Sequence, residues 1–135
     1  MTLVDSDVFS LLYVRSASMD SRVAEWQEYL GGRRVVVSFQ THAEILAGAY
    51  GAGWGQRRTD GLIQILARSP TIHSDADVVE AFAKLTAECM RMGHALHDKV
   101  HTGDRWIAAC AIAKDIELLA GDGIFQDAPG LTLRH

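Results

Sequence analysis

The hydrophobic positions of the chain fall into short runs separated by stretches with helical spacing. The runs are typical of short buried strands and cover residues 3–4, 35–37 and 116–120, with weaker candidates at 71–73 and 131–133. Between them, apolar residues recur three or four positions apart, which predicts helices. Strands that alternate with helices indicate an α/β domain with a mostly parallel sheet.

The predicted helices differ in how polar they are. They cover residues 19–30, 38–48, 75–93 and 104–114, with shorter helices after the first strand and around 62–66. We expect Ser6 or Asp7 to cap the first of them. Residues 104–114 are almost wholly apolar, which predicts a helix buried at the centre of the domain. The glycine-rich residues 48–55 are expected to form a helix end and a loop.

Composition limits the class of protein. The 135 residues are 48% hydrophobic and 22% charged, a globular balance that excludes a disordered chain or a fibrous repeat. The absence of repeats and linkers predicts a single domain over residues 1–135. No apolar run is long enough for a bilayer, and Asp5 stands where a signal peptide would need basic residues, so we expect a soluble cytoplasmic protein without membrane contact. The net charge of −4 argues against a passive nucleic-acid coat but not against an enzyme acting on nucleic acid.

Four acidic residues stand where a parallel sheet binds its ligands, outside the carboxyl ends of its strands. Asp5 and Asp122 directly follow predicted strands, and Glu44 lies about two turns into the helix that follows residues 35–37. Asp104 opens the apolar helix, where its carboxylate is expected to face inward. The sequence therefore predicts that four carboxylates converge from distant parts of the chain.

Each acid taken alone is explained by a structural role as a helix cap, a turn residue or a solvated helix position. Together they are harder to explain in that way, because each stands in apolar sequence, where a lone buried carboxylate is costly. Converging like charges repel unless a cation or shared protons hold them. A hard divalent cation that prefers oxygen ligands resolves the repulsion, so the acids predict Mg²⁺ or Mn²⁺.

The residues around the four acids resemble the motifs of the PIN domain family. The resemblance rests on Leu3-Val-Asp5-Ser-Asp7-Val-Phe-Ser10, His42-Ala-Glu44-Ile-Leu-Ala-Gly48, Asp104-Arg-Trp-Ile-Ala-Ala-Cys-Ala111 and Leu118-Leu-Ala-Gly-Asp122-Gly-Ile-Phe125. Their order and spacing cover essentially the whole chain, and its short length is similar to VapC-type toxins of bacterial toxin–antitoxin pairs.

The resemblance implies a three-layer α/β/α fold and a Mg²⁺-dependent endoribonuclease, with Mn²⁺ as a substitute. Asp5, Glu44, Asp104 and Asp122 match the family's acidic residues and are the expected catalytic and metal-binding residues. In such a site the metal activates a water for attack on an RNA phosphodiester. The implied partners are RNA, a cognate antitoxin protein and a second copy of the chain in a homodimer.

Two positions depart from the family's pattern and leave alternatives open. Asp7 stands where the family usually has Asn, and Ala120 stands where a Thr or Ser is common. Both favour an alternative function, a PIN-like module that binds RNA or protein without cleaving it. A nuclease that acts on DNA with the same metal chemistry is a third possibility.

Basic residues are candidates for binding RNA phosphates, or else serve solubility at helix ends. Arg105 is the foremost candidate because it is next to Asp104, and the pairs Arg33-Arg34 and Arg57-Arg58 are the others.

Three histidines suggest a weaker hypothesis. His94, His97 and His101 would share one face of a continuous helix and bind zinc, but the flanking glycines favour a solvated connection. In the same stretch, Asp98 is a candidate outer acid of the four-acid cluster.

Overall fold

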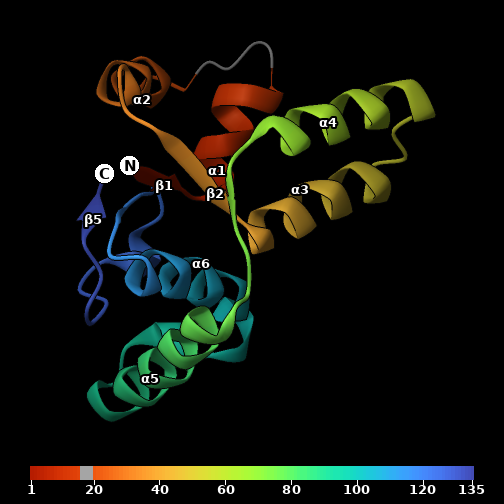
Figure 1. Ribbon diagram of the computed structural model, residues 1–135. Helices are drawn as coiled ribbons and strands as arrows, with labels where there is room; N and C mark the ends of the chain where they lie inside the picture. The colour runs from red at the N-terminus through yellow and green to blue at the C-terminus, as the bar shows by residue number, and fades with distance from the viewer. Residues whose placement is uncertain (16–19) are drawn as a thin grey trace.

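The computed structural model describes residues 1–15 and 20–135, which fold around a five-stranded parallel sheet (Figure 1). The strands are β1 (Thr2–Val4), β2 (Val35–Ser38), β3 (Thr71–Ile72), β4 (Glu117–Leu119) and β5 (Leu133–Arg134). They lie in the order β3-β2-β1-β4-β5, and every neighbouring pair is parallel. The predicted α/β class and parallel sheet are confirmed, including both weaker strand candidates.

The strand order places a switch in winding direction at the centre of the sheet. The chain adds β2 and β3 on one side of β1 and then crosses back to add β4 and β5 on the other. Crevices for ligands form at such a switch, outside the carboxyl ends of the strands. Leu3 and Val4 of the central strand are fully buried, as expected for a strand covered on both faces.

The helices are longer than the strands that they connect. They are α1 (Ser6–Phe9), which continues as the π-helical turn η1 (Ser10–Val14), α2 (Arg22–Leu30), α3 (Phe39–Gly51), α4 (Gln56–Arg68), α5 (Ala76–Met92) and α6 (Thr102–Ala113). Short 3₁₀ turns are η2 (Ala95–His97), η3 (Lys99–His101) and η4 (Gly123–Phe125). Within the described residues, no helix is long and apolar enough to cross a membrane.

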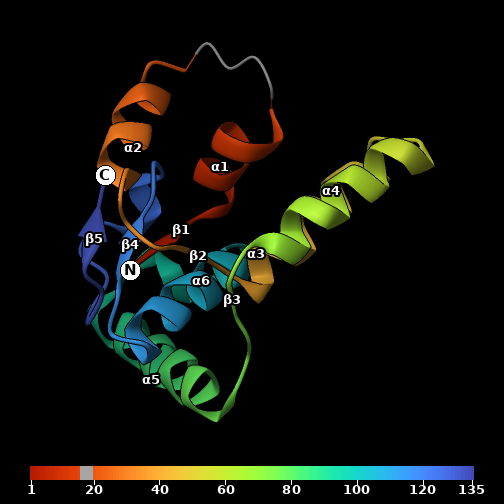
Figure 2. The same ribbon diagram turned by 45° about the horizontal axis from the view of Figure 1, so that its top comes forward.

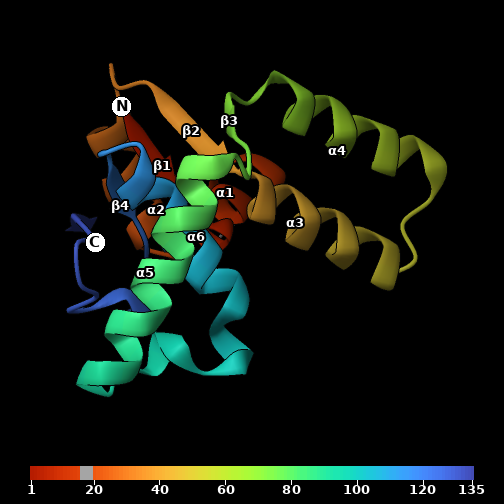
Figure 3. The same ribbon diagram turned by 60° about the horizontal axis from the view of Figure 1, so that its bottom comes forward.

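Two hydrophobic cores flank the sheet and make three layers (Figure 2). One core packs α5 and α6 beneath the sheet, and α6 supplies its most buried stretch, which confirms the predicted central helix. The other core joins α1, α2, α3 and α4 above it. The α3–α4 hairpin projects away from the body of the domain in every view (Figures 1 and 3).

Three predicted helix boundaries differ in the structure. Asp5, rather than Ser6 or Asp7, caps α1, because its carboxylate accepts a hydrogen bond from the Val8 N–H at 2.9 Å. Helix α3 continues to Gly51, so only the second half of the glycine-rich stretch is a loop. Helix α4 is longer than predicted and begins with the polar residues from Gln56 onward. The predicted helix start at residue 19 lies outside the described residues.

Candidate active site

Asp5 directly follows the central strand β1 and is a buried acid. Its side chain is only 4% exposed and caps α1. The pKa of Asp5 is raised to about 7, chiefly by burial and also by the negative charges of Asp7, Asp122 and Asp104, while the hydrogen bond from Val8 opposes the rise. The charge of a carboxyl group at this position is therefore disfavoured by burial and by the neighbouring acids, and favoured by the cap and by the nearby Arg22.

Asp104 lies in the first turn of α6, partly buried, and its Oδ2 is 3.0 Å from Nδ1 of His101. Burial raises the pKa of Asp104, the His101 contact opposes this, and the charges of Asp122 and Glu44 add to the rise. Asp122 follows β4 and caps η4 by accepting a hydrogen bond from the Ile124 N–H at 3.0 Å. The charges of Asp104 and Asp122 both act on Asp5, so the three acids lie at the same edge of the sheet.

Glu44 reaches this edge from α3. Its carboxylate accepts hydrogen bonds from the Ser6 hydroxyl and from Nε2 of Gln40, the latter at 3.1 Å. Gly103 makes room for it, because a Cβ atom there would lie 2.6 Å from Glu44 Oε1. Sequence analysis missed Gly103, although a glycine directly before Asp104 is a signal of close approach.

The four predicted acids therefore interact electrostatically at one edge, although their oxygens are not gathered around a single point. Among the described residues, no three His, Cys, Asp or Glu side chains are close enough to hold a metal ion together. Glu44 and Asp104 are instead turned to hydrogen-bond donors of the protein. What the edge supplies is a set of oxygen donors with an excess of negative charge.

Arg22 is a cation beside this edge that sequence analysis also missed. Its guanidinium contacts the Asp20 carboxylate at 2.8 and 3.1 Å and lies over the Trp26 ring, 4.9 Å from the centroid. It donates to the carbonyl oxygen of Gly121 at 3.2 Å, and a Cβ atom on Gly121 would lie only 2.5 Å from Nη1. Arg22 thus holds the backbone that directly precedes Asp122.

A model of the PIN domain family matches residues 2–131, which include all four acids. The chain belongs to the PIN domain family. No curated protein matches this PIN domain significantly.

Solved structures share the fold of this PIN domain at low sequence identity. VapBC-1 from nontypeable Haemophilus influenzae is 21% identical with a TM-score of 0.77, covering 98% of this chain and 96% of that one. VapBC2 from Rickettsia felis, bound to a DNA fragment from its promoter, is 18% identical with a TM-score of 0.76 over the same shares. VapBC-5 from Mycobacterium tuberculosis, of the VapBC family of toxin–antitoxin systems, is 21% identical with a TM-score of 0.68, covering 98% and 95%.

Arg105, the predicted phosphate-binding residue of this PIN domain, lies in the protein interior. It is only 7% exposed, its Nη1 donates to the Leu96 carbonyl, and its guanidinium lies 4.8 Å from the Phe82 ring centroid. This placement does not favour the predicted role, because a buried guanidinium that donates to the protein's own backbone is not presented to a substrate. Arg105 ties η2 to α6 and α5 instead.

The histidine-rich connection of the PIN domain is not a continuous helix, so the predicted zinc face is not formed. His94 bonds to the Leu96 N–H and to the Gln126 carbonyl, whereas His101 contacts Asp104. Asp98 lies 3.4 Å from His97 across their side chains, and its carboxylate is half exposed. The connection positions Asp104 through His101.

The arginine pairs lie at different ends of the domain. Arg33 precedes β2 and contacts Glu117 at 3.9 Å, at the amino ends of the strands and away from the four acids. Arg57 and Arg58 begin α4 in the projecting hairpin.

Proposed function

We propose that this PIN domain is a Mg²⁺-dependent endoribonuclease that acts as the toxin of a type II toxin–antitoxin pair. The observation that carries the proposal is the buried Asp5 carboxyl group, whose pKa is raised at the switch point of the sheet by its burial and by other acids, including Asp104 and Asp122. Such a cluster is stable as a set of ionised groups only with a cation. Cleavage of RNA follows from the family together with this chemistry.

The donor set fits Mg²⁺, with Mn²⁺ as a substitute, because all four side chains offer carboxylate oxygens. Asp5, Glu44, Asp104 and Asp122 would hold the ion. When bound, the ion supplies a nucleophilic water at neutral pH and neutralises charge on the phosphodiester.

The neighbours of the acids orient them. His101 fixes one side of the Asp104 carboxylate, and Ser6 with Gln40 fixes Glu44 against Gly103. Carboxylates held in this way lose little freedom when they bind a cation. Arg22 adds a positive charge beside Asp122 and steadies the loop that carries it.

The two departures from the family pattern are compatible with catalysis. Ala120 is fully buried in the core that packs α5 and α6, so this position faces packed side chains rather than a substrate. Asp7 is exposed, and its charge acts on Asp5, which adds to the demand for a cation. A cation would satisfy both acids.

The partners that we propose are an RNA substrate, an antitoxin protein and a second copy of the chain, all in the cytoplasm. The support for the antitoxin is the fold shared with VapBC structures, one of which is described as a member of a toxin–antitoxin family. An antitoxin would hold the nuclease inactive until it is removed.

The test is cleavage of labelled RNA by the purified protein. We expect cleavage with Mg²⁺, none with EDTA, and no effect of a zinc-selective chelator. Asp5→Asn and Asp104→Asn should each lower the rate about 100-fold or more, because each removes a charge that holds the cation. Asp60→Asn, the same change on an exposed face of α4, is the matched control. Full Mg²⁺-dependent cleavage by both active-site variants would refute the proposed site.

A non-cleaving module is the alternative, favoured by Asp7 and Ala120. Expression separates the two functions, because a nuclease toxin arrests growth and its Asp5→Asn variant does not. If both proteins have the same effect on growth, the binding module is the better description.

A further inference from the structure

A groove leads away from Glu44, one of the four acids, along the projecting hairpin. Its first part has a volume of about 700 Å³ and begins at Ser6, Asp7 and Glu44. Its second part, of about 690 Å³, lies over the start of α4. The two parts share the lining residues Val14, Trp54, Arg58 and Leu62, so they form one continuous depression between η1 and the α3–α4 hairpin.

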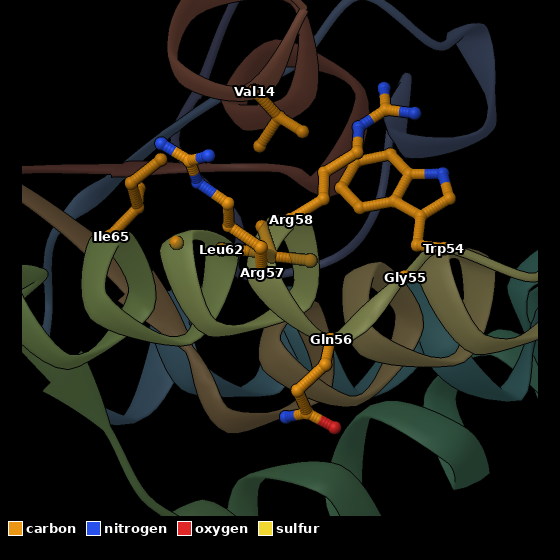
Figure 4. A pocket seen from close by; sticks show the side chains of 9 residues that line it. Val14, Trp54, Gly55, Gln56, Arg57, Arg58, Leu62 and Ile65 are labelled. Carbon is orange, nitrogen blue, oxygen red and sulfur yellow. The ribbon is translucent and has the colours of Figure 1, made fainter.

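The far part of this groove is basic. Arg57 and Arg58 line it, and Arg15 lines the part nearer to the acids. Neither Arg57 nor Arg58 forms an ion pair with any residue that the structure describes. Figure 4 shows both guanidinium groups extending from α4 to the side where Val14 lies, whereas Gln56 points away. These two charges are available to an anionic ligand.

The walls between the charges are aromatic and aliphatic. The Arg58 guanidinium lies over Trp54, with its Cζ atom 3.6 Å from the ring centroid, in a cation–π contact. Val14, Leu62 and Ile65 complete the apolar surface. A strip that combines guanidinium groups with an aromatic ring and apolar walls matches a nucleic-acid single strand, whose bases stack while its phosphates pair with arginine.

We propose that this arginine groove, defined by Arg15, Trp54, Arg57 and Arg58, binds the single-stranded RNA segment that flanks the phosphodiester to be cleaved. Arg57 and Arg58 contact phosphates, and a base stacks on the Arg58–Trp54 pair. The proposal rests on the proposed nuclease function and adds to it a second, separate binding site. Continuity with the acids favours RNA over a protein ligand, because the strand that is cut must pass the acids and continue along a surface.

Binding is measured by fluorescence anisotropy with a labelled oligouridine of about 12 nucleotides, within the usual site size for such surfaces. The background is the full chain with Asp104→Asn, measured in EDTA so that the RNA stays intact. Arg57→Ala with Arg58→Ala should weaken binding about tenfold at physiological salt. The slope of log Kd against the logarithm of the salt concentration should fall by about 1.4 in this double variant. Each phosphate contact to a single strand contributes about 0.7 to that slope.

Two further variants make the test specific. Arg68→Ala with Arg91→Ala removes the same charge from exposed positions outside the groove and should leave both quantities unchanged. Arg58→Lys keeps the charge and should retain the salt dependence while losing affinity through weaker stacking. Thermal melting of every variant excludes loss of folding as the cause.

The outcomes separate the two proposals. Wild-type protein that cleaves no RNA refutes the nuclease function, whereas the groove is judged from the binding data. If the Arg57–Arg58 double variant binds RNA as the Arg68–Arg91 control does, the groove proposal is wrong. Unchanged RNA binding together with loss of antitoxin binding would likewise overturn it and assign the groove to a protein.

Discussion

The two edges of the sheet, at the amino ends and at the carboxyl ends of the parallel strands, shift the pKa of a carboxyl group in opposite directions. At the amino ends of the strands, Glu117 accepts hydrogen bonds from Thr2 and Tyr29 and lies 3.9 Å from Arg33. Burial tends to raise the pKa of Glu117, but these partners outweigh it and lower the pKa. At the carboxyl ends, the pKa of Asp5 is raised to about 7 by burial and by other acids. The charge of Glu117 is therefore favoured by its partners within the chain, whereas the charge of Asp5 is disfavoured.

The same contrast separates two arginines that look alike in their contacts. Arg105 lies over Phe82 and Arg58 lies over Trp54. Arg105 is buried and donates to a backbone carbonyl, whereas Arg58 lines an open groove. A residue's type and its aromatic neighbour therefore do not reveal its role. What distinguishes the two arginines is their exposure: the Arg105 guanidinium is enclosed by the protein, whereas the Arg58 guanidinium is open to solvent.

The largest expected effect is on stability at the acidic edge. Folded protein holds the Asp5 proton up to about pH 7, while the unfolded chain releases it near 3.8, so raising the pH through this window favours unfolding. Asp5→Asn keeps the cap and removes the charge. Without divalent cations at a pH of about 8, it should raise the free energy of unfolding by up to about 4 kcal/mol.

Urea unfolding at a series of pH values measures this difference, which should disappear only below a pH of about 3, where both the folded and the unfolded state hold the proton. Glu117→Gln is the matched control with the opposite sign. The lowered pKa of Glu117 means that its stabilisation is present above the unfolded pKa and lost as the pH falls, so the variant should be less stable at neutral pH. If the two substitutions changed the free energy of unfolding in the same direction at neutral pH, the proposed difference between the two edges would be wrong.

The second effect concerns the buried arginine. Arg105→Ala leaves a cavity and an unsatisfied Leu96 carbonyl, so we expect a loss of about 3 kcal/mol in the free energy of unfolding. Cleavage per folded molecule should be unchanged. Arg91→Ala, at an exposed position, should stay within about 0.5 kcal/mol of wild type. A stable Arg105→Ala protein with a raised KM for RNA would restore the substrate-binding role predicted from the sequence.

The third effect is confined to catalysis. In Gly103→Ala the new Cβ atom would lie 2.6 Å from Glu44 Oε1 and displace that carboxylate. We expect about 10- to 100-fold slower cleavage, with little change in stability because alanine favours the helix. Gly51→Ala meets nothing within 4 Å and is the control in steady-state kinetics. Unimpaired cleavage by Gly103→Ala would show that the position of Glu44 does not matter.

The sequence predicted the elements whose signal is local. Short apolar runs predicted all five strands. Asp5 and Asp122 were predicted as site residues because each of them follows a predicted strand. The apolar character of 104–114 was enough to place α6 in the core, because a helix without a polar face has no side for solvent.

The parts that were missed depend on contacts between distant segments. Gly103 and Gly121 are explained only by side chains that arrive from α3 and α2. Arg105 was assigned to the substrate because it follows Asp104, yet successive helix residues point about 100° apart, so adjacency in sequence did not mean a shared face. Arg22 contacts Gly121 across the fold, which no local pattern in the chain could indicate.

The measurement that tests the central claim most directly is calorimetric titration of Mn²⁺ into the metal-free protein near pH 7, in two buffers of different ionisation enthalpy. Wild type should bind the ion and release a proton, because the raised pKa leaves Asp5 partly protonated before binding. Asp5→Asn should lose the proton release and most of the affinity, and Asp60→Asn should behave as wild type. Equal Mn²⁺ binding by Asp5→Asn and wild type would contradict the account.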